Sequence, residues 1–293
     1  MTEAVTPKKL RSAVPGRILG KTIVYLFLSI LAVVTLFPIF YALMASFKSN
    51  MEILTGSSTL LPTEFHFENY SQAWSIANFG RYTWNSVYLA FFTVLGAIVG
   101  STMGGYVFAR GEFPGKKLLF GIITSTMFIS LGSITLFPLL EITKVLHLNN
   151  TLWGVIVINV FGLNVTNLYL VRAYVTTIPR EIDEAAIIDG CGFFKTFTHI
   201  IFPLLKPVIA TVGLLSFRMA WNDYLLPMVF TMANRAQSPL VVGVVALRSN
   251  GEVASSWNLM LAGTMISILP MMIAYLGFNK YFVAGLTSGA VKG

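Results

Sequence analysis

One short segment has the side chains of a contact surface for another protein. Glu184 is followed by Ala185 and Ala186, and Asp189-Gly190 comes shortly after. Alanines let two helices approach closely, glycine permits a sharp chain reversal, and a carboxylate pairs with a basic group or with a helix N-terminus. These residues therefore predict protein–protein contact and no covalent chemistry.

The surrounding segment, residues 179–203, has the pattern of two short helices joined by a turn. Pro179 suits a first helical turn, and the carboxylates after it lie where the positive end of a helix favours them. Two glycines end this helix, and aromatic residues and isoleucines then recur at helical spacing. A strip of Ile182, Ala185 and Ala186 suits docking against another protein. From the residues alone, an amphipathic helix pair lying on lipid headgroups is the alternative.

A second group of polar residues lies within an otherwise apolar run: Arg218, Trp221, Asn222 and Asp223. A charged residue near the centre of a membrane helix costs about 2.5 to 3.5 kcal/mol on insertion scales, so it normally faces a bundle interior or a cavity. An aromatic face and an amide suit a hydroxyl-rich solute, which makes these residues candidates for a translocation path. The alternative is that they only hold the bundle together. The preceding run contains further polar residues, which are assigned to hydrogen bonds between helices: Asn159, Asn164, Thr166 and Asn167.

The composition places these residues in a membrane protein. Hydrophobic residues make up 55% of the 293 residues, charged residues 11%, and the mean hydropathy is +0.74. A helix needs an apolar run of about 18 to 25 residues to cross the hydrocarbon core. Such runs are residues 22–46, 85–109, 118–140, 152–171, 204–230 and 258–279. We therefore expect an all-α integral membrane protein with about six transmembrane helices and a helical hairpin. Pro203, Pro207 and Pro227 predict that the fifth run is bent.

The basic residues predict the orientation of the chain. If the N-terminus lies inside, fourteen of the 20 Lys and Arg fall in cytoplasmic segments, five fall outside and Arg218 lies within the fifth run. The positive-inside rule then places both termini and the hairpin in the cytoplasm. Residues 1–21 form a cytoplasmic N-terminal segment, and residues 22–293 form the transmembrane domain, whose first run is a retained helix rather than a signal peptide. The outer connection, residues 47–84, reads as an ordered loop with short helices.

Other functions find little support in the sequence. Cys191 is the single cysteine, so an intrachain disulfide or a cysteine-based metal cage cannot form. Gly20-Lys21 and Gly115-Lys116 lack the other residues of a phosphate loop, so we expect no ATP and no other cofactor in this chain. No constellation has the pattern of a catalytic site, so we expect no enzyme. The net charge of +8 is distributed by side of the membrane, which argues against nucleic-acid binding.

The hairpin resembles the EAA loop of bacterial ABC importer permeases. The resemblance rests on Glu184-Ala185-Ala186, Gly190, Ile200 and Pro203. Phe202 departs from the usual leucine but is also bulky and apolar. Three further segments resemble the smaller, six-helix permease of the maltose-type carbohydrate branch: Met44–Lys48, Trp221–Pro227 and Tyr281–Gly293.

This resemblance implies one subunit of a complex in the bacterial inner membrane. Its partners would be a second permease, two ATPase subunits that bind ATP and Mg, and an extracytoplasmic solute-binding protein. A sugar or oligosaccharide would cross by alternating access, and Glu184 and Gly190 would couple closure of the ATPases to the membrane helices. Because the partner permease of this branch supplies most sugar contacts, the residues from Arg218 to Asp223 would line the path without setting specificity.

Two other functions are weighed against this one. The first is a permease for another solute, such as a phosphorylated or acidic compound, because only the branch resemblance favours a neutral oligosaccharide. The second is an exporter or a channel, which would have a similar number of helices. Exporters of this superfamily usually couple through extended helices and often carry a fused ATPase domain, so the hairpin favours an importer.

Overall fold

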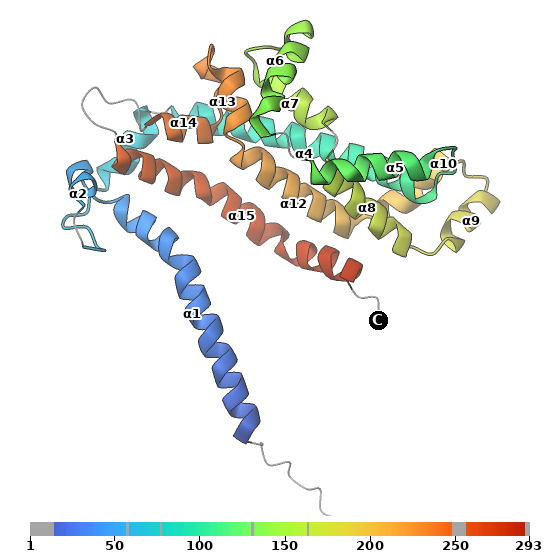
Figure 1. The fold of residues 1–293 in the computed structure, drawn as a ribbon, viewed down its shortest axis with the longest axis horizontal. Helices are drawn as coiled ribbons and strands as arrows, with labels where there is room; N and C mark the ends of the chain where they lie inside the picture. The colour runs from blue at the N-terminus through green and yellow to red at the C-terminus, as the bar shows by residue number, and fades with distance from the viewer. Residues whose placement is uncertain are drawn as a thin grey trace, which may run out of the picture.

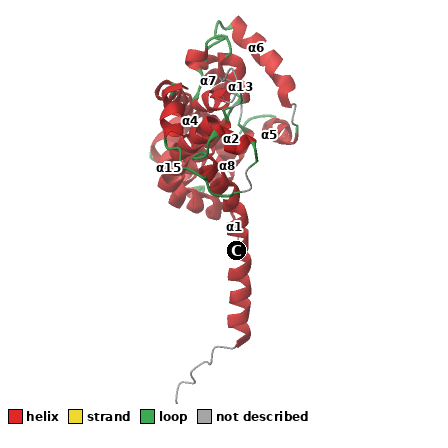
Figure 2. Ribbon diagram, turned by 90° about the vertical axis from the view of Figure 1, so that its left-hand side faces the viewer, coloured by secondary structure: helices red, strands yellow, loops and turns green. Residues whose placement is uncertain are grey.

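The structure, a computed structural model, consists of helices joined by turns and loops, with no β-strand in the part of the chain that it describes (Figures 1 and 2). The described residues are 15–56, 59–76, 78–129, 132–162, 164–247 and 256–290. The predicted N-terminal segment is therefore described only from Pro15, and residues 291–293 lie outside the description. Within these ranges the predicted all-α fold is confirmed.

The first helix, α1 (Pro15–Ala45), diverges from the other long helices. Its apolar stretch, Gly20–Ala45, has a mean hydropathy of 2.6 and is exposed along nearly its whole length. Figure 1 shows it projecting away from the bundle, with its C-terminal end near α2 (Asn50–Leu54). An apolar helix with so little burial in its own chain suits an environment of lipid or of other membrane helices.

Four helices pack together as the main bundle: α4 (Phe79–Arg110), α8 (Val165–Thr177), α12 (Lys206–Asn222) and α15 (Trp257–Ala290). Helix α4 packs on both α8 and α12, and α15 packs on α12. The close approach of α4 to α8 depends on Gly104 and Gly105. A Cβ at these positions would come within 2.7 Å of Leu168 and 2.6 Å of Val171. Small residues commonly bring membrane helices together in this way.

The described residues do not confirm the expected count of six membrane spans. Among the described residues, four helices are long and apolar enough to cross a membrane, and a bent pair adds a fifth. The run predicted as the third span, residues 118–140, is divided into shorter segments: α5 (Lys116–Ser125), η1 (Thr126–Phe128), η2 (Gly132–Thr135) and α6 (Leu136–Val145). At Gly132, the first residue of η2, the φ angle is +54°, which interrupts a continuous right-handed helix. The expected single helix is therefore corrected to a series of short helices.

Two other predicted spans are interrupted. The fourth consists of α7 (Leu152–Phe161) and α8, and Asn164 caps α8 by accepting a hydrogen bond from the backbone N–H of Asn167 at 3.1 Å. The fifth begins with a bend of 79° between residues 193–204 and α12. Pro203 and Pro207 flank this bend, which confirms the bent helix predicted from the prolines.

The connections between helices gather at the two ends of the bundle. The hairpin end holds residues 181–204, the last turns of α4 and α8, and the start of α5. In the described part of the chain, the opposite end holds five short helices: α2, α3 (Glu68–Ile76), α13 (Leu225–Thr231), η4 (Arg235–Gln237) and α14 (Leu240–Ala246). Helices α2 and α3 confirm the predicted ordered connection between the first two spans.

Asn69 of α3 joins three parts of the chain at the opposite end. Its buried amide donates hydrogen bonds to the carbonyl oxygens of Ser46 at 2.9 Å and Lys48 at 3.0 Å. Its amide oxygen accepts a hydrogen bond from Asn258 of α15 at 2.9 Å. This arrangement satisfies carbonyls just beyond the last turn of α1 and ties that turn to α15.

Candidate functional site

The predicted hairpin is present as two short helices around a tight turn. The first is α9 (Glu181–Ile188), and the second runs from α10 (Phe193–Thr196) through a π-helical segment, η3 (Phe197–Ile201), to α11 (Phe202–Leu204). The turn depends on Gly190, whose φ angle of +76° is strained for residues with a Cβ. Backbone N–H groups of Gly190 and Cys191 donate to the carbonyls of Ile187 at 3.0 Å and Ala186 at 2.8 Å, which closes the end of α9.

The inner face of the hairpin packs against its own bundle. Ala186 is 2% exposed, and Ile182 packs on the apolar cluster between α4, α8 and α12. The ring of Tyr106, on α4, lies between those of Phe193 and Phe197, with centroids 4.7 Å and 5.2 Å away. The hairpin is therefore held to the end of α4 by aromatic and aliphatic packing.

A charged contact adds to this packing. The Asp183 carboxylate forms an ion pair with Arg110, the last residue of α4, with 2.9 Å between Oδ2 and Nε. The Tyr106 hydroxyl donates a hydrogen bond to Oδ1 of the same carboxylate at 3.2 Å, and Arg110 also donates to the carbonyl of Ile178 at 2.5 Å. Because both charged side chains are largely buried, loss of either partner leaves a desolvated charge.

The outer face of α9 is exposed. It carries Glu184, Ala185 and Asp189, together with Ile187 and Ile188, which are 67% and 86% exposed. Two large aliphatic side chains thus lie exposed beside a carboxylate on this face. We call Glu184, Ile187 and Ile188 the outer stripe, since their spacing places them on one side of the helix.

The structure divides the predicted coupling residues between the two faces. Glu184, Ala185, Asp189 and Gly190 are exposed, while Ala186 points into the bundle, where its small size lets α9 approach. The predicted docking strip of Ile182, Ala185 and Ala186 is therefore corrected, because Ile182 and Ala186 face inward. The sequence analysis did not predict the outer stripe, although two isoleucines three and four residues after Glu184 have the spacing that places them on one face of a helix.

Basic side chains surround the hairpin end. Lys116 donates a hydrogen bond to the carbonyl of Gly111 at 2.7 Å, and the guanidinium of Arg172 lies 4.1 Å from the ring centroid of Phe120. Burial lowers the pKa of Lys116, and the positive charges of Arg172 and Arg180 lower it further. At the same end α9 carries the carboxylates of Glu181, Asp183 and Glu184, so this end of the bundle has charges of both signs.

The second predicted group, in α12, does not form one site. Trp221 is 3% exposed, its indole Nε1 donates to the carbonyl of Ser267 on α15 at 3.1 Å, and its ring stacks on Phe217 at 5.4 Å. Asn222 donates to the carbonyl of Arg218 at 2.9 Å within the helix, and both side chains are exposed. Asp223 follows the last residue of α12. Trp221 thus holds α12 to α15, as the alternative interpretation proposed.

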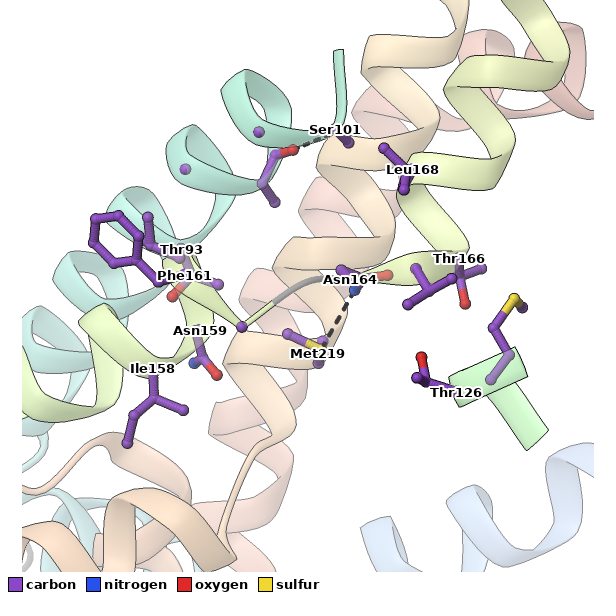
Figure 3. A pocket seen from close by; sticks show the side chains of 17 residues that line it. Thr93, Ser101, Thr126, Ile158, Asn159, Phe161, Asn164, Thr166, Leu168 and Met219 are labelled. Carbon is purple, nitrogen blue, oxygen red and sulfur yellow. Dashed lines mark hydrogen bonds between the residues drawn. The ribbon is translucent and has the colours of Figure 1, made fainter. Parts of the chain in front are cut away.

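A cavity of about 530 Å³ lies instead at the break between α7 and α8, bounded also by α4, η1 and α12 (Figure 3). Its polar lining includes Thr93, Asn159 and Asn164, and Met219 contributes from α12. None of the four residues predicted from α12 is among those that line it. The assignment of the fourth-span amides to contacts between helices holds for Asn167, which donates to Ser216 at 2.9 Å. Asn159 and Asn164 were missed as cavity residues.

Comparison with known proteins identifies the family. Residues 96–288 match the family described as binding-protein-dependent transport system inner membrane component. The chain belongs to this family, and it is accordingly a multi-pass inner-membrane subunit of an ABC importer and not an enzyme. Within the described residues, no group of His, Cys, Asp and Glu is arranged to hold a metal ion.

Similar proteins include sugar importer permeases. The chain is 33% identical over 272 residues to the melibiose/raffinose/stachyose import permease protein MelC of Bacillus subtilis (strain 168), covering 92% of this chain and 96% of the relative. It is 31% identical over 271 residues to the arabinooligosaccharides transport system permease protein AraQ of the same organism, covering 92% and 94%. A solved bacterial ABC transporter involved in the import of the acidic polysaccharide alginate has a chain of similar fold. The TM-score is 0.77, with 27% sequence identity and coverage of 94% of this chain and 100% of that one.

Proposed function

We propose that this chain is one of two permease subunits of an ATP-driven importer for sugars or oligosaccharides. Its partners are a second permease, two ATPase subunits that bind ATP and Mg, and an extracytoplasmic protein that delivers the solute. Family membership and the sugar-importing relatives support this function. The hairpin, with one face anchored and the other exposed, is the observation that carries it.

The outer stripe is the docking surface for an ATPase subunit in this proposal. Ile187 and Ile188 provide apolar area, and Glu184 provides a carboxylate for a basic group or a helix N-terminus of the partner. The opposite face of α9 is joined to Arg110 by the Asp183 ion pair. A displacement of the hairpin by the ATPases is therefore transmitted to α4.

Helix α4 then connects the hairpin to the cavity. Arg110 and Tyr106 hold the hairpin at one end of α4, and Thr93 lines the cavity near its middle. Because α4 also packs on α8 and α12, a shift of its end changes the packing around the cavity. This is the physical route for alternating access in this subunit.

The proposed orientation places the hairpin end in the cytoplasm, together with both chain termini. Lys116, Arg172, Arg180 and Lys206 support it, because basic residues are concentrated on the cytoplasmic side of membrane proteins. The opposite end, with α2, α3 and α14, then faces the solute-binding protein.

The test is reconstitution of this chain with its partner permease, ATPase subunits and binding protein in lipid vesicles. We expect the loaded binding protein to stimulate ATP hydrolysis. Ile188→Ser and Glu184→Ala should abolish this stimulation, because they remove the two kinds of contact on the outer stripe. Glu112→Ala is the matched control, since Glu112 is an exposed carboxylate at the hairpin end but outside the hairpin.

Two results would contradict the proposal. The first is a purified complex that contains no ATPase subunit or whose hydrolysis ignores the loaded binding protein. The second is full stimulation in both outer-stripe variants, which would remove the hairpin from coupling.

A further inference from the structure

Two polar groups that line the cavity at the α7–α8 break have no hydrogen-bond partner. The amide nitrogen Nδ2 of Asn159 and the hydroxyl of Thr93 are both buried without a hydrogen-bond partner. Buried polar groups are nearly always hydrogen-bonded, since leaving one unpaired in an apolar interior is unfavourable. Both residues line the cavity, and Thr93 is fully buried behind it, so a rotation of either side chain toward the cavity would let a solute hydroxyl satisfy it.

The interrupted backbone supplies further hydrogen-bonding groups to the same space. Gly162 has an extended conformation, with ψ of 110°, and α8 begins beyond it with Asn164 as its cap. The first turn of a helix has N–H groups without acceptors inside the helix. Irregular backbone at membrane depth is tolerated where it is buried in protein or lines a cavity, and here Gly162, Asn164 and Thr166 line one.

The lining has hydrogen-bonding groups but no formal charge. The lining residues that the structure describes are hydroxyl, amide, glycine and apolar residues, with no Asp, Glu, Lys or Arg among them. Phe161, Leu168 and Met219 add apolar surface to the same lining. The nearby cation of α12, Arg218, does not line the cavity. A carboxylated solute would therefore meet no opposite charge in this lining.

We propose that this cavity is a binding subsite for a neutral carbohydrate within this subunit, an inference that rests on the proposed import function. Carbohydrates combine hydroxyl groups with apolar C–H faces, which match the two kinds of surface. The volume of about 530 Å³ falls in the usual range of small-molecule sites. The subsite binds its solute through Asn159, Thr93 and the start of α8. The subsite selects against acidic sugars, whereas the similar solved transporter is involved in the import of the acidic polysaccharide alginate.

The experiment uses the complete complex, arrested with ATP and vanadate in detergent and equilibrated with a radiolabelled probe. The probes are a neutral trisaccharide and a trisaccharide of uronic acids. We expect the wild-type complex to retain the neutral probe and to bind the uronate at least about tenfold more weakly. Asn159→Leu, which keeps the side-chain size, should weaken binding of the neutral probe about five- to tenfold, and Thr93→Val about twofold.

Thr35→Val is the matched control for Thr93→Val. The Thr35 hydroxyl lies on exposed α1 and donates to the carbonyl of Leu31, so this change should leave solute retention unaltered. Binding-protein-stimulated ATP hydrolysis is measured on every variant. Stimulation can be normal while Asn159→Leu and Thr93→Val retain the neutral probe to the same extent as the wild-type complex. It can also be normal while the uronate binds more tightly than the neutral probe. Either result contradicts the subsite and leaves the import function standing. If wild type itself shows no stimulation, the import function fails and the subsite with it.

Discussion

The hairpin and the polar group of α12, Arg218 to Asp223, differ in where the fold places their side chains. Around Gly190 the chain leaves the bundle, so one face of α9 is free and carries Glu184 and Ile188 on its surface. Helix α12 is contacted by α4, α8 and α15, and Trp221 is enclosed between its own helix and α15. The hairpin therefore presents Glu184 and Ile188 together on one surface, whereas α12 buries Trp221 and leaves Arg218 and Asn222 exposed.

The largest effect that separates the two regions is expected for Trp221→Ala. Removing the indole leaves a void between α12 and α15 and deletes the hydrogen bond to Ser267, which should destabilise the protein by about 3 to 5 kcal/mol. The thermal midpoint of the purified complex reports this loss. Trp84→Ala is the control, because Trp84 is 69% exposed and should change stability by less than about 1 kcal/mol. Equal midpoints for the two variants would show that Trp221 has no structural role.

Arg110→Ala should have an intermediate effect that is confined to the hairpin. It leaves the Asp183 carboxylate largely buried without its ion pair, at a cost of about 1 to 3 kcal/mol. Hydrogen exchange should become faster in α9 and remain unchanged in α15. Arg180→Ala removes an exposed arginine at the same end and should leave exchange in α9 as it is. Unchanged protection of α9 in Arg110→Ala would mean that apolar packing alone holds the hairpin.

The smallest effect is expected at the turn of the hairpin. A Cβ at Gly190 would touch nothing within 4 Å, so Gly190→Ala acts only through its φ angle of +76° and should cost about 1 kcal/mol. Gly192→Ala is a matched control, because its Cβ also has free space and its φ angle is −73°. Differential scanning calorimetry of the two complexes should show a lower midpoint of thermal unfolding for Gly190→Ala only. If Gly192→Ala destabilises as much, backbone strain at Gly190 is not what shapes the turn.

Local sequence features determined much of the fold of this protein. Long apolar runs predicted α1, α4 and α15, because a helix that crosses lipid must be about 20 residues long and must satisfy its own backbone. The prolines around Leu205 predicted the bend, and the glycines after α9 predicted the turn at Gly190. These signals depend on neighbours within a few residues, so they are visible without knowledge of the rest of the chain.

Tertiary structure decided which way each side chain faces and how the third predicted span is divided. Ile182 and Ile188 are the same residue type in α9, yet Ile182 is partly buried against the cluster that contains Tyr106, whereas Ile188 is 86% exposed. Asn167 and Asn159 are both amides of the fourth span, but Asn167 donates a hydrogen bond to Ser216 of α12, whereas the Asn159 Nδ2 atom has no hydrogen-bond partner. Orientation depends on partners that lie far away in the chain. The sequence alone therefore located the hairpin, but only the packing of α4, α8 and α12 revealed the outer stripe and the cavity.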